Sequence, residues 1–513
     1  MVRQIRFLVV LLAGLALLAV ARADAQGRTF YISYSSGSNS NPGTQSAPWK
    51  THPYMSSGSA CTGTGSAPSY THQAGDHFIF RGGETWPSAC LPLTIKASGT
   101  SGAIDYYGVD QSWYSGISWK RPLFDANYKT VNNMVNASGI TYITLDNLEL
   151  AHQGITPSAT FSTASCGIFF GQTTWGGWKA GTTVENVYLH DWAVTSNLNA
   201  YPANNFDNVC VGGIVGAAEV SGIETSDANG YAYINGTKTN GLMGGGVAFV
   251  GELKNSKIHD GWNGCTTSGS CHDTEFYHIE QSNIANYTGV HSQVIEDNEP
   301  CPSTTGNSMP TYNNVIHDNG SGVNIFIRYF SPVYNNVMWN NTNNYAIRLC
   351  VPTTDSSSHA GYVLNNTIDV SGSNEGGTAV GVTGSSAVGT LYIANNIIVN
   401  GSSSFGISAA SEHYSNNYAM PAAEAITYGL ASLNLYAPIS ADSNIVNKGS
   451  NLSGSCSGSM KMLCSDAQGA FWYGGSYQPR PTGTSAWTLG AYVVGGQSAA
   501  HPNAPTGLVA TVQ

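Results

Sequence analysis

Five Asn-Asn pairs recur down the second half of the chain. Successive pairs are 22, 30, 30 and 21 residues apart, and each lies in a short apolar or aromatic stretch, such as YNNVIHDN from Tyr312 or ANNIIVNG from Ala394. A repeat of this size, carried by short strands rather than helices, is typical of a solenoid of stacked β coils. The pairs are Asn313-Asn314, Asn335-Asn336, Asn365-Asn366, Asn395-Asn396 and Asn416-Asn417.

Stacking gives these pairs a physical reason. Coils that lie about 4.8 Å apart bring the same residue of successive coils into a column, and amides in a column hydrogen-bond to one another. Weaker copies of the repeat occur upstream, in LDNLEL from Leu145, VENVYLHDW from Val184, LKNSKIHDG from Leu253 and QSNIANYTG from Gln281. The repeats therefore cover most of the chain and predict one all-β solenoid with irregular loops.

The N-terminus has the pattern of a secretory signal peptide over residues 1–25. Arg3 and Arg6 precede an apolar run from Phe7 to Val20, which is followed by small residues up to Ala25. This run is short for a membrane span, and an uncleaved anchor is the alternative. We expect a secreted protein without a membrane span.

Ten cysteines fit an oxidising compartment. No Cys-x-x-Cys spacing points to zinc, so structural disulfides are the preferred interpretation. Cys265 with Cys271 and Cys456 with Cys464 are close enough in sequence to close single loops. Further candidate pairs are Cys61 with Cys90, Cys166 with Cys210 and Cys301 with Cys350.

The chain is acidic. It has 19 basic and 30 acidic residues, and removal of residues 1–25 leaves a net charge of −13. Because no basic run interrupts this surface, we expect no nucleic-acid partner. A polyanionic glycan would be repelled unless bound calcium or a local basic patch reversed the sign.

Both ends of the chain resemble secreted bacterial right-handed parallel β-helix proteins of the polysaccharide-lyase-like and choice-of-anchor type. At the start the resemblance lies in TFYISYSSGSNSNPGTQSAPWKT from Thr29 and GDHFIFRGGETW from Gly75. At the end it lies in SADSNIVNKGS from Ser440, DAQGAFW from Asp466, RPTG from Arg480 and LGAYVVG from Leu489. Asn39 departs from the family, where an acidic residue is common.

The resemblance implies a single right-handed parallel β-helix domain over residues 26–495. Residues 26–90 would form the N-terminal cap and first coils, and residues 435–495 the closing segment. The last stretch, 496–513, reads as a linker or as the truncated start of a fibronectin type III-like module. The scaffold itself carries lyases, hydrolases, epimerases, adhesins and tailspikes, so it does not define an activity.

Residues 252–299 hold ten charged side chains and four histidines, which makes this window the best candidate site by composition. A more polar set of loops is the structural alternative. A lyase needs a base beside a uronate carboxylate and a cation to neutralise it. Lys254, Lys257 and His259 are candidate bases. Glu296, Asp297 and Glu299 are candidate calcium ligands.

A hydrolase needs two carboxylates across the sugar instead. Asp273 or Glu275 paired with Asp297 is the candidate, because the offsets of 24 and 22 residues are close to one coil. The chain contains neither a polygalacturonase-like Asp-Asp and Gly-His-Gly pattern nor a clear lyase signature.

Four His-Asp pairs occur in the chain. His190-Asp191, His259-Asp260 and His317-Asp318 recur at equivalent repeat positions, so we interpret them as structural caps of strand ends and turns. His272-Asp273 lies off that register and is the stronger catalytic candidate.

Two arginines and three tryptophans complete the candidates. Arg328 and Arg348 are 20 residues apart, and they either bind an anion or bridge acidic neighbours on adjacent coils. We group Arg328 with the catalytic residues and Arg348 with the substrate-binding residues. Exposed indoles stack on sugar rings, and Trp175, Trp178 and Trp262 are the candidates for that role.

These observations predict a secreted, monomeric polysaccharide-binding protein. Family resemblance favours a calcium-assisted lyase acting on a uronate-containing glycan. A non-catalytic adhesion or glycan-binding protein and a glycoside hydrolase with paired carboxylates are the alternatives.

Overall fold

The computed structural model describes most of the chain between residues 27 and 493. The described residues are 27–63, 65–155, 166–171, 174–197, 213–234, 237–240, 244–280, 293–297, 308–320, 322–342, 345–351, 359–372, 378–384, 389–401, 411–438, 444–465 and 477–493. The predicted signal peptide and the tail at 496–513 lie outside them. No helix among the described residues is long and apolar enough to cross a membrane.

Three long parallel sheets run along the molecule, and we call them sheets A, B and C. Sheet A consists of β1 (Thr29–Ile32), β2 (His77–Phe80), β5 (Asp105–Gly108), β8 (Ile143–Asp146), β12 (Lys179–Glu185), β16 (Ala217–Ser221), β21 (Glu252–Lys254), β24 (Cys271–His272), β27 (Thr311–Tyr312), β30 (Val333–Tyr334), β33 (Ala360–Leu364), β36 (Thr390–Ala394) and β38 (Ser411–Ser415).

Sheet B consists of β3 (Thr85–Pro87), β6 (Leu123–Asp125), β9 (Glu149–Ala151), β13 (Tyr188–His190), β17 (Glu224–Ser226), β22 (Lys257–Gly261), β25 (Glu275–Ile279), β28 (Val315–His317), β31 (Val337–Trp339), β34 (Thr367–Asp369), β37 (Ile397–Val399) and β39 (Tyr418–Met420). Sheet C consists of β4 (Leu93–Thr94), β7 (Val135–Asn136), β11 (Ile168–Phe169), β15 (Ile214–Val215), β20 (Val247–Ala248), β23 (Cys265–Thr266), β26 (Gln293–Glu296), β29 (Val323–Arg328), β32 (Tyr345–Val351) and β35 (Thr378–Gly384).

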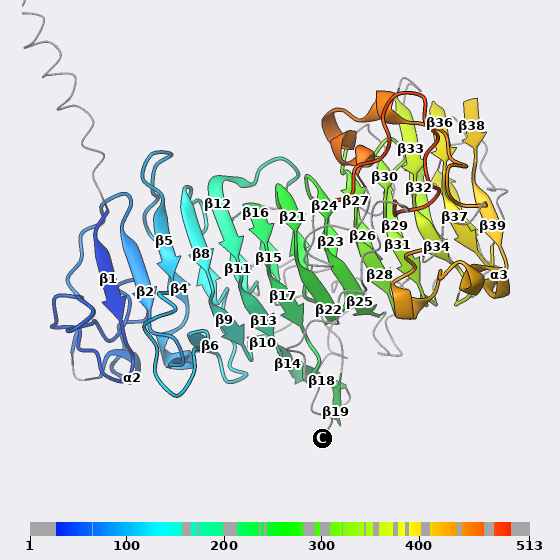
Figure 1. Ribbon diagram of the computed structural model, residues 1–513. Coiled ribbons are helices and arrows are strands. Elements are labelled where there is room, and N and C mark those ends of the chain that lie inside the picture. The colour runs from blue at the N-terminus through cyan, green and yellow to red at the C-terminus, as the bar shows by residue number, and fades with distance from the viewer. Residues whose placement is uncertain are drawn as a thin grey trace, which may run out of the picture.

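The chain visits the sheets in the order A, B, C and then starts the next coil, so each strand pairs with its counterpart one coil away (Figure 1). The prediction of a right-handed parallel β-helix is therefore confirmed, with the handedness expected of parallel crossovers. A fourth, small sheet projects from it: β10 (Gly154–Ile155), β14 (Ala193–Asn197), β18 (Tyr231–Ile234) and β19 (Thr237–Asn240). The helical elements are α2 (Ser59–Thr62), α3 (Ala422–Thr427), η1 (Ser88–Cys90), η5 (Ser432–Asn434), η6 (Ser453–Ser455) and η7 (Gly458–Cys464).

The core follows from the alternation of strand side chains. On sheet A the inward column contains Leu145, Val184, Val220 and Leu253, which are register partners in successive coils and are all 0% exposed. Burial of such a column is the main contribution to stability, at roughly 25 cal/mol per Å² of apolar surface. The intervening side chains point outward and are free to build a surface.

The Asn-Asn pairs mark the corner between sheets A and B. The first asparagine of each pair adopts a positive φ, from 53° to 61°, which asparagine tolerates better than most residues. The second asparagine points inward and joins the predicted amide column. From Asn314 through Asn336, Asn366 and Asn396 to Asn417, each side-chain amide donates to the next carbonyl oxygen at 2.9–3.1 Å.

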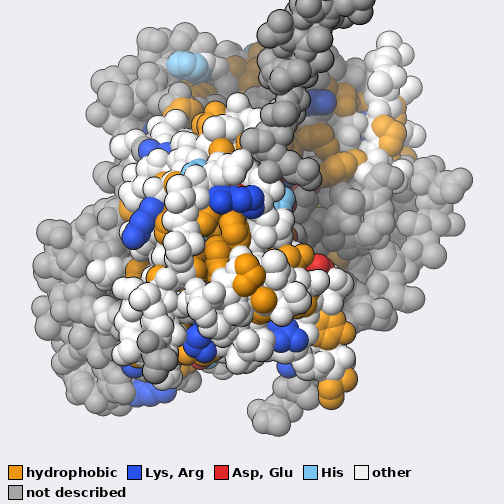
Figure 2. Space-filling model, turned by 90° about the vertical axis from the view of Figure 1, so that its left-hand side faces the viewer, with side chains coloured by type: hydrophobic (Ala, Val, Ile, Leu, Met, Phe, Trp, Pro, Cys, Tyr) orange, Lys and Arg blue, Asp and Glu red, His pale blue; other side chains and the backbone are white. Residues whose placement is uncertain are grey.

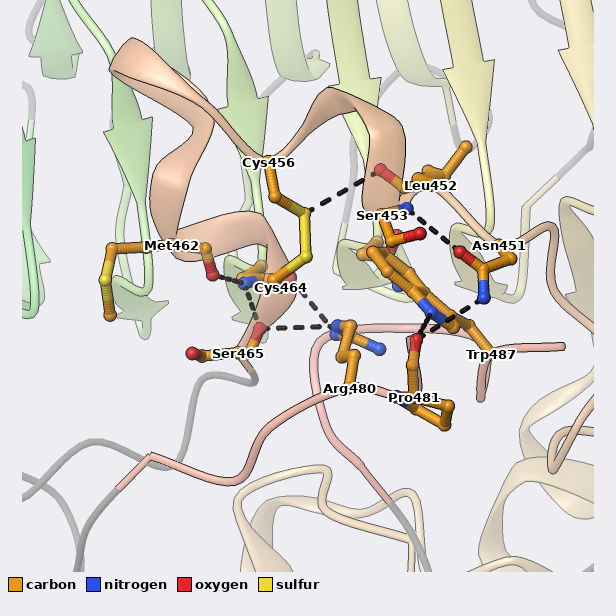
Figure 3. The surroundings of a disulfide bond; sticks show 12 residues. Asn451, Leu452, Ser453, Cys456, Met462, Cys464, Ser465, Arg480, Pro481 and Trp487 are labelled. Carbon is orange, nitrogen blue, oxygen red and sulfur yellow. Dashed lines mark hydrogen bonds between the residues drawn. A yellow bond between two sulfur atoms is a disulfide. The ribbon is translucent and has the colours of Figure 1, made fainter. Parts of the chain in front are cut away.

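The C-terminal segment, of which residues 444–465 and 477–493 are described, lies over the outer face of sheet A near the end of the solenoid. Trp487 is fully buried against Tyr334, Leu364 and Ala394, and the buried Arg480 donates to Asn335 at 3.1 Å. Figure 3 shows both residues beside the Cys456–Cys464 disulfide. This segment covers apolar side chains that would otherwise be exposed.

The opposite end of the solenoid has a different surface. Figure 2 looks onto the N-terminal end, where lysine and arginine side chains surround apolar ones and few carboxylates are visible. A cavity of about 310 Å³ at this end is lined by Arg28, Phe30, Trp49 and Tyr70, among others. Asn39 accepts hydrogen bonds from the backbone N–H groups of residues 50 and 51, so its amide shapes a turn.

Three predicted disulfides are present among the described residues: Cys61–Cys90, Cys265–Cys271 and Cys456–Cys464. Cys166 and Cys350 are also disulfide-bonded. Their predicted partners, Cys210 and Cys301, lie outside the described residues.

Candidate functional site

A network of charged side chains crosses the outer face of sheet A at β16, β21 and β24. Lys254 Nζ lies 2.9 Å from Glu219 Oε1 and 2.6 Å from Glu252 Oε2. The other oxygen of Glu252 contacts His272 Nε2 at 3.0 Å, and His272 Nδ1 contacts Asp273 Oδ2 at 2.6 Å. Strand register explains the arrangement, because Glu219 is the partner of Glu252, and Lys254 is the partner of His272.

The network fixes the protonation of its members. Burial disfavours the His272 cation, but hydrogen bonds to Asp273 and Glu252 outweigh this effect and raise the pKa of His272. The hydrogen bond from His272 is the largest of the effects that lower the pKa of Glu252 to about 2. Burial also opposes the charge on Lys254, yet its bonds to Glu252 and Glu219 raise the pKa of Lys254. At neutral pH Glu252 is therefore a carboxylate, both of its basic neighbours are stabilised in their charged forms, and Lys254 is a poor base.

Two tryptophans flank this network at the corner where sheet C leads into sheet A. Trp175 and Trp178 are half-buried, and their rings form an edge-to-face pair with centroids 5.3 Å apart. Trp175 Nε1 donates to the carbonyl oxygen of Ser268 at 3.2 Å. Trp178 lies against Gly251 and Gly269, where a Cβ atom would come within 3.0 and 3.1 Å of the indole. Gly251 immediately precedes β21, and Gly269 lies shortly before β24. Because neither glycine has a side chain, the indole fits beside the charged network.

Aromatic rings border the network on its C-terminal side. Tyr312, the register partner of His272 in the next coil, stacks on the imidazole with a centroid distance of 4.4 Å and an interplanar angle of 6°. Tyr334 stacks on Tyr312 in turn. Tyr477 of the C-terminal segment lies close to Asp273. Burial and the charge of Asp273 together raise the pKa of Tyr477. Stacked aromatic rings therefore cover this edge of the network.

The second predicted lysine lies around the corner on sheet B. Lys257 is the register partner of Glu275, and their charged groups are 3.4 Å apart. The other oxygen of Glu275 contacts His317 Nε2 at 3.2 Å, while His317 Nδ1 contacts Asp318 Oδ2 at 2.6 Å. Lys254 and Lys257 thus serve two separate networks on two faces of the solenoid.

The four His-Asp pairs share one local geometry. In each, the histidine Nδ1 contacts the following aspartate, and Nε2 contacts a glutamate on the preceding coil: His190 with Glu149, His259 with Glu224, His272 with Glu252 and His317 with Glu275. Every one of these aspartates has a positive φ, from 48° to 56°. His272-Asp273 occupies a different position in the repeat. Asp273 lies at the corner between sheets A and B, where the Asn-Asn pairs have their first asparagine.

The predicted calcium ligands lie at the end of β26 and directly after it. Glu296 is the last residue of β26 and is half-buried. Asp297 follows it and is buried, and both its oxygens accept hydrogen bonds from Arg328 at 2.9 and 2.7 Å. Burial raises the pKa of Asp297 to about 6 although Arg328 opposes this shift. Glu299 lies outside the described residues. Asp297 therefore forms an ion pair with Arg328, which bridges adjacent coils, and calcium binding at this position stays a prediction.

Other predicted residues are placed elsewhere. Of the carboxylates predicted to pair, Asp297 follows a strand of sheet C, Asp273 precedes β25 of sheet B, and Glu275 is the first residue of β25. Trp262 directly follows β22 and is 3% exposed, so its indole face is not available for stacking on a sugar. Arg348 lies over the rings of Phe326 and Tyr345 and donates to Thr383 at 3.1 Å.

Sequence reasoning missed Glu219. It lies 33 residues before Glu252, outside the charge-rich window, and its role follows only from strand register. The sequence contained one signal of this role. Glu219 and Glu252 occupy the same position in equivalent repeats, immediately before Val220 and Leu253.

Comparisons with known proteins find distant similarity to solved structures. No protein-family model matches the chain, and no curated protein matches it. Among solved structures, pectate lyase Pel9A is similar with 14% identity over 91% of this chain and 96% of its own, at a TM-score of 0.42. A GH136 lacto-N-biosidase from Eubacterium ramulus has 12% identity over 77% of this chain and 68% of its own, at 0.39, and a rhamnogalacturonan lyase has 13% identity over 76% and 87%, at 0.34. At such identities and TM-scores, function has to be argued from this chain's own residues.

Proposed function

We propose that this protein is a secreted carbohydrate-active β-helix that binds a polysaccharide across the outer face of sheet A. One observation carries the proposal: Trp175 and Trp178, half-exposed, lie beside the charged network of Glu219, Lys254 and Glu252. Indole faces stack on the C–H faces of sugars, and carboxylates accept hydrogen bonds from sugar hydroxyls. The combination is that of a glycan-binding surface.

Charge favours a neutral glycan over a uronate polymer. The two basic side chains of the network, Lys254 and His272, each lie between two carboxylates. A uronate carboxylate would have to displace one of these partners inside a chain with a net charge of −11. A neutral sugar needs only hydroxyl contacts with Glu219 and Glu252.

Binding is tested by titrating a panel of neutral and uronate-containing oligosaccharides by calorimetry. We expect Trp178→Ala to weaken binding of the recognised glycan at least tenfold, since burying a large apolar side chain contributes roughly 1.5–3 kcal/mol. Tyr392→Ala is the matched control, because Tyr392 is a 36% exposed aromatic residue farther along sheet A. Equal losses in both variants, or no loss in Trp178→Ala, would place the glycan elsewhere.

A pair of neighbouring carboxylates favours hydrolysis as a second function of the same site. Both glutamates contact the Lys254 ammonium, which places Glu219 Oε1 and Glu252 Oε2 within about 5.5 Å of each other. Retaining glycosidases hold their two carboxyl groups about 5–5.5 Å apart. Once a sugar displaced Lys254 from between the two carboxyl groups, ionised Glu252 would attack the anomeric carbon while protonated Glu219 gave its proton to the leaving oxygen, and Glu219 would then take a proton from the water that releases the sugar from Glu252.

Cleavage is tested by following new reducing ends and ultraviolet absorbance at once, with and without calcium. Reducing ends alone, lost at least 100-fold in Glu252→Gln but kept in Asp110→Asn on an exposed loop, are expected for hydrolysis. Calcium-dependent absorbance from unsaturated ends would instead support the lyase that family resemblance favours. Binding with neither product would leave a non-catalytic glycan-binding protein.

A further inference from the structure

Sheet B carries a cluster of potential metal ligands that the glycan site does not use. His152, His190 and Asp191 each offer a ligand atom, and these atoms lie within 4.8 Å of one another. His152 follows β9 and His190 ends β13, so the two histidines come from adjacent coils, with ring centroids 5.8 Å apart. Their sequence separation hides the cluster from any short metal motif.

Both imidazoles are oriented in the way that metal-binding histidines usually are. A metal ligand histidine typically donates its second ring N–H to a carboxylate, which fixes the tautomer and the ring. His152 Nδ1 contacts Asp125 Oδ1 at 2.9 Å, and His190 Nε2 contacts Glu149 Oε1 at 3.1 Å. His152 Nε2 and His190 Nδ1 are then the nitrogens that face a shared ion.

Asp191 is held in place as well. The backbone N–H of Asn229 donates to Asp191 Oδ1 at 3.0 Å, and the Asn229 amide donates to Asp191 Oδ2 at 3.3 Å. Side-chain exposure is 30% for His152 and 12% for both His190 and Asp191, so solvent reaches the cluster. An ion bound there would keep a position open for water.

The repeat supplies an internal comparison. The units around His259, His272 and His317 have the same His-Asp-Glu geometry, and only the unit around His190 forms such a ligand group among the described residues. His278 comes nearest to providing a second histidine elsewhere, but its Nδ1 is bonded to Asp260 itself at 3.1 Å. His152 is therefore what distinguishes this unit.

We propose that His152, His190 and Asp191 bind one Zn²⁺ ion. Zinc takes imidazole and carboxylate ligands at about 2.0–2.2 Å in a tetrahedral arrangement, so the cluster closes by roughly 1 Å around the ion. The ion replaces the proton on His190 Nδ1, and that proton leaves to solvent. Two nitrogens and one oxygen suit zinc rather than calcium, which prefers oxygen ligands.

The test is Zn²⁺ titration of metal-stripped, tag-free mature protein by calorimetry, with Ca²⁺ as the parallel ion. We expect one Zn²⁺ per chain, no Ca²⁺ at the same concentration, and a cobalt-substituted protein with the visible absorption of a tetrahedral ion. His152→Asn should weaken Zn²⁺ binding about 100-fold, because asparagine keeps the positive φ of 56° and removes the ligand. Asp125→Asn should weaken it 10–100-fold.

His278→Asn is the matched control, because His278 has a φ of 49° and lies on the same face of sheet B. Unchanged zinc affinity in His278→Asn, together with a loss in His152→Asn, supports the site. Absence of stoichiometric binding by the unmodified chain overturns it, and so does an equal loss in the two variants. Thermal unfolding of each variant without metal shows that the fold is kept, and the cobalt spectrum of the unmodified chain tests the site without any substitution.

Discussion

Asn366 shows how one side chain ties three coils together. Its amide donates to the carbonyl oxygen of Val333 at 3.1 Å and to Asn396 Oδ1 at 3.0 Å, and its own oxygen accepts from Asn336. Because the site is fully buried, each bond that is lost leaves a polar group without water. The amide column is therefore a stabilising element as well as a marker of the repeat.

We expect Asn366→Ala to lower the free energy of unfolding by about 3 kcal/mol, since each buried unsatisfied group costs about 1–3 kcal/mol. Urea unfolding followed by circular dichroism measures the change. Asn132→Ala, at an exposed position, is the control and should change it by less than about 0.5 kcal/mol. A loss no larger in Asn366→Ala than in the control would contradict a stabilising amide column.

The charged network on sheet A predicts that the folded chain loses stability both at high pH and at low pH. His272 has a raised pKa, so its contribution is complete below about 6.5, its usual pKa, and disappears as pH rises through the raised value. Glu252 has a pKa of about 2, so its contribution is complete above about 4.5 and disappears as pH falls toward 2. We expect the stability lost in His272→Gln to be larger at pH 6 than at pH 10.

Chemical unfolding of this variant and the parent at several pH values measures the difference. His77→Gln, at an exposed histidine on β2, controls for the loss of an imidazole as such. A stability loss in His272→Gln that stays constant from pH 6 to pH 10 would mean that His272 is neutral in the folded chain.

At the scale of elements, the C-terminal segment acts as a cover for sheet A. Trp487 is fully buried between this segment and β30, β33 and β36, and its Nε1 donates to the carbonyl oxygen of Pro481 at 2.7 Å. We expect Trp487→Ala to cost about 3–5 kcal/mol and to make the segment cleavable by protease before the coils unfold. Leu433→Ala, at a 92% exposed side chain, should leave both the unfolding midpoint and the cleavage pattern unchanged. Cleavage that begins only with global unfolding would show that the segment and coils form one cooperative unit.

The elements also show what sequence reasoning reaches. The repeat was visible because most coils reuse the same corner, an asparagine or aspartate with positive φ followed by an inward side chain, although Gly222 takes that place between β16 and β17. The functional surface was not visible as a unit, since Trp175 meets Ser268 across 93 residues of chain, and the coils between them differ in length. The proximity of side chains such as Trp175 and Glu219 to the charged network can be predicted only once strand register is known. Whether Trp262 is buried likewise depends on where β22 ends.

At the scale of the whole molecule, net charge acts on every ligand that approaches. Nineteen basic and 30 acidic residues give a field that repels polyanions and leaves neutral molecules unaffected. Screening shortens the reach of this field to about 10 Å at 0.1 M salt. Salt dependence therefore separates a neutral glycan from a uronate polymer without knowledge of the exact sugar.

We expect the affinity for a bound neutral oligosaccharide to change less than twofold between 20 and 300 mM NaCl. Affinity for a polygalacturonate fragment of the same length should be weak at 20 mM and should rise severalfold at 300 mM, because salt screens the repulsion. Calorimetric or fluorescence titration in a calcium-free buffer measures both. If uronate binding is instead tightest at low salt and weakens as salt is added, a local cationic site outweighs the negative field of the molecule, and the uronate-directed interpretation replaces the neutral one.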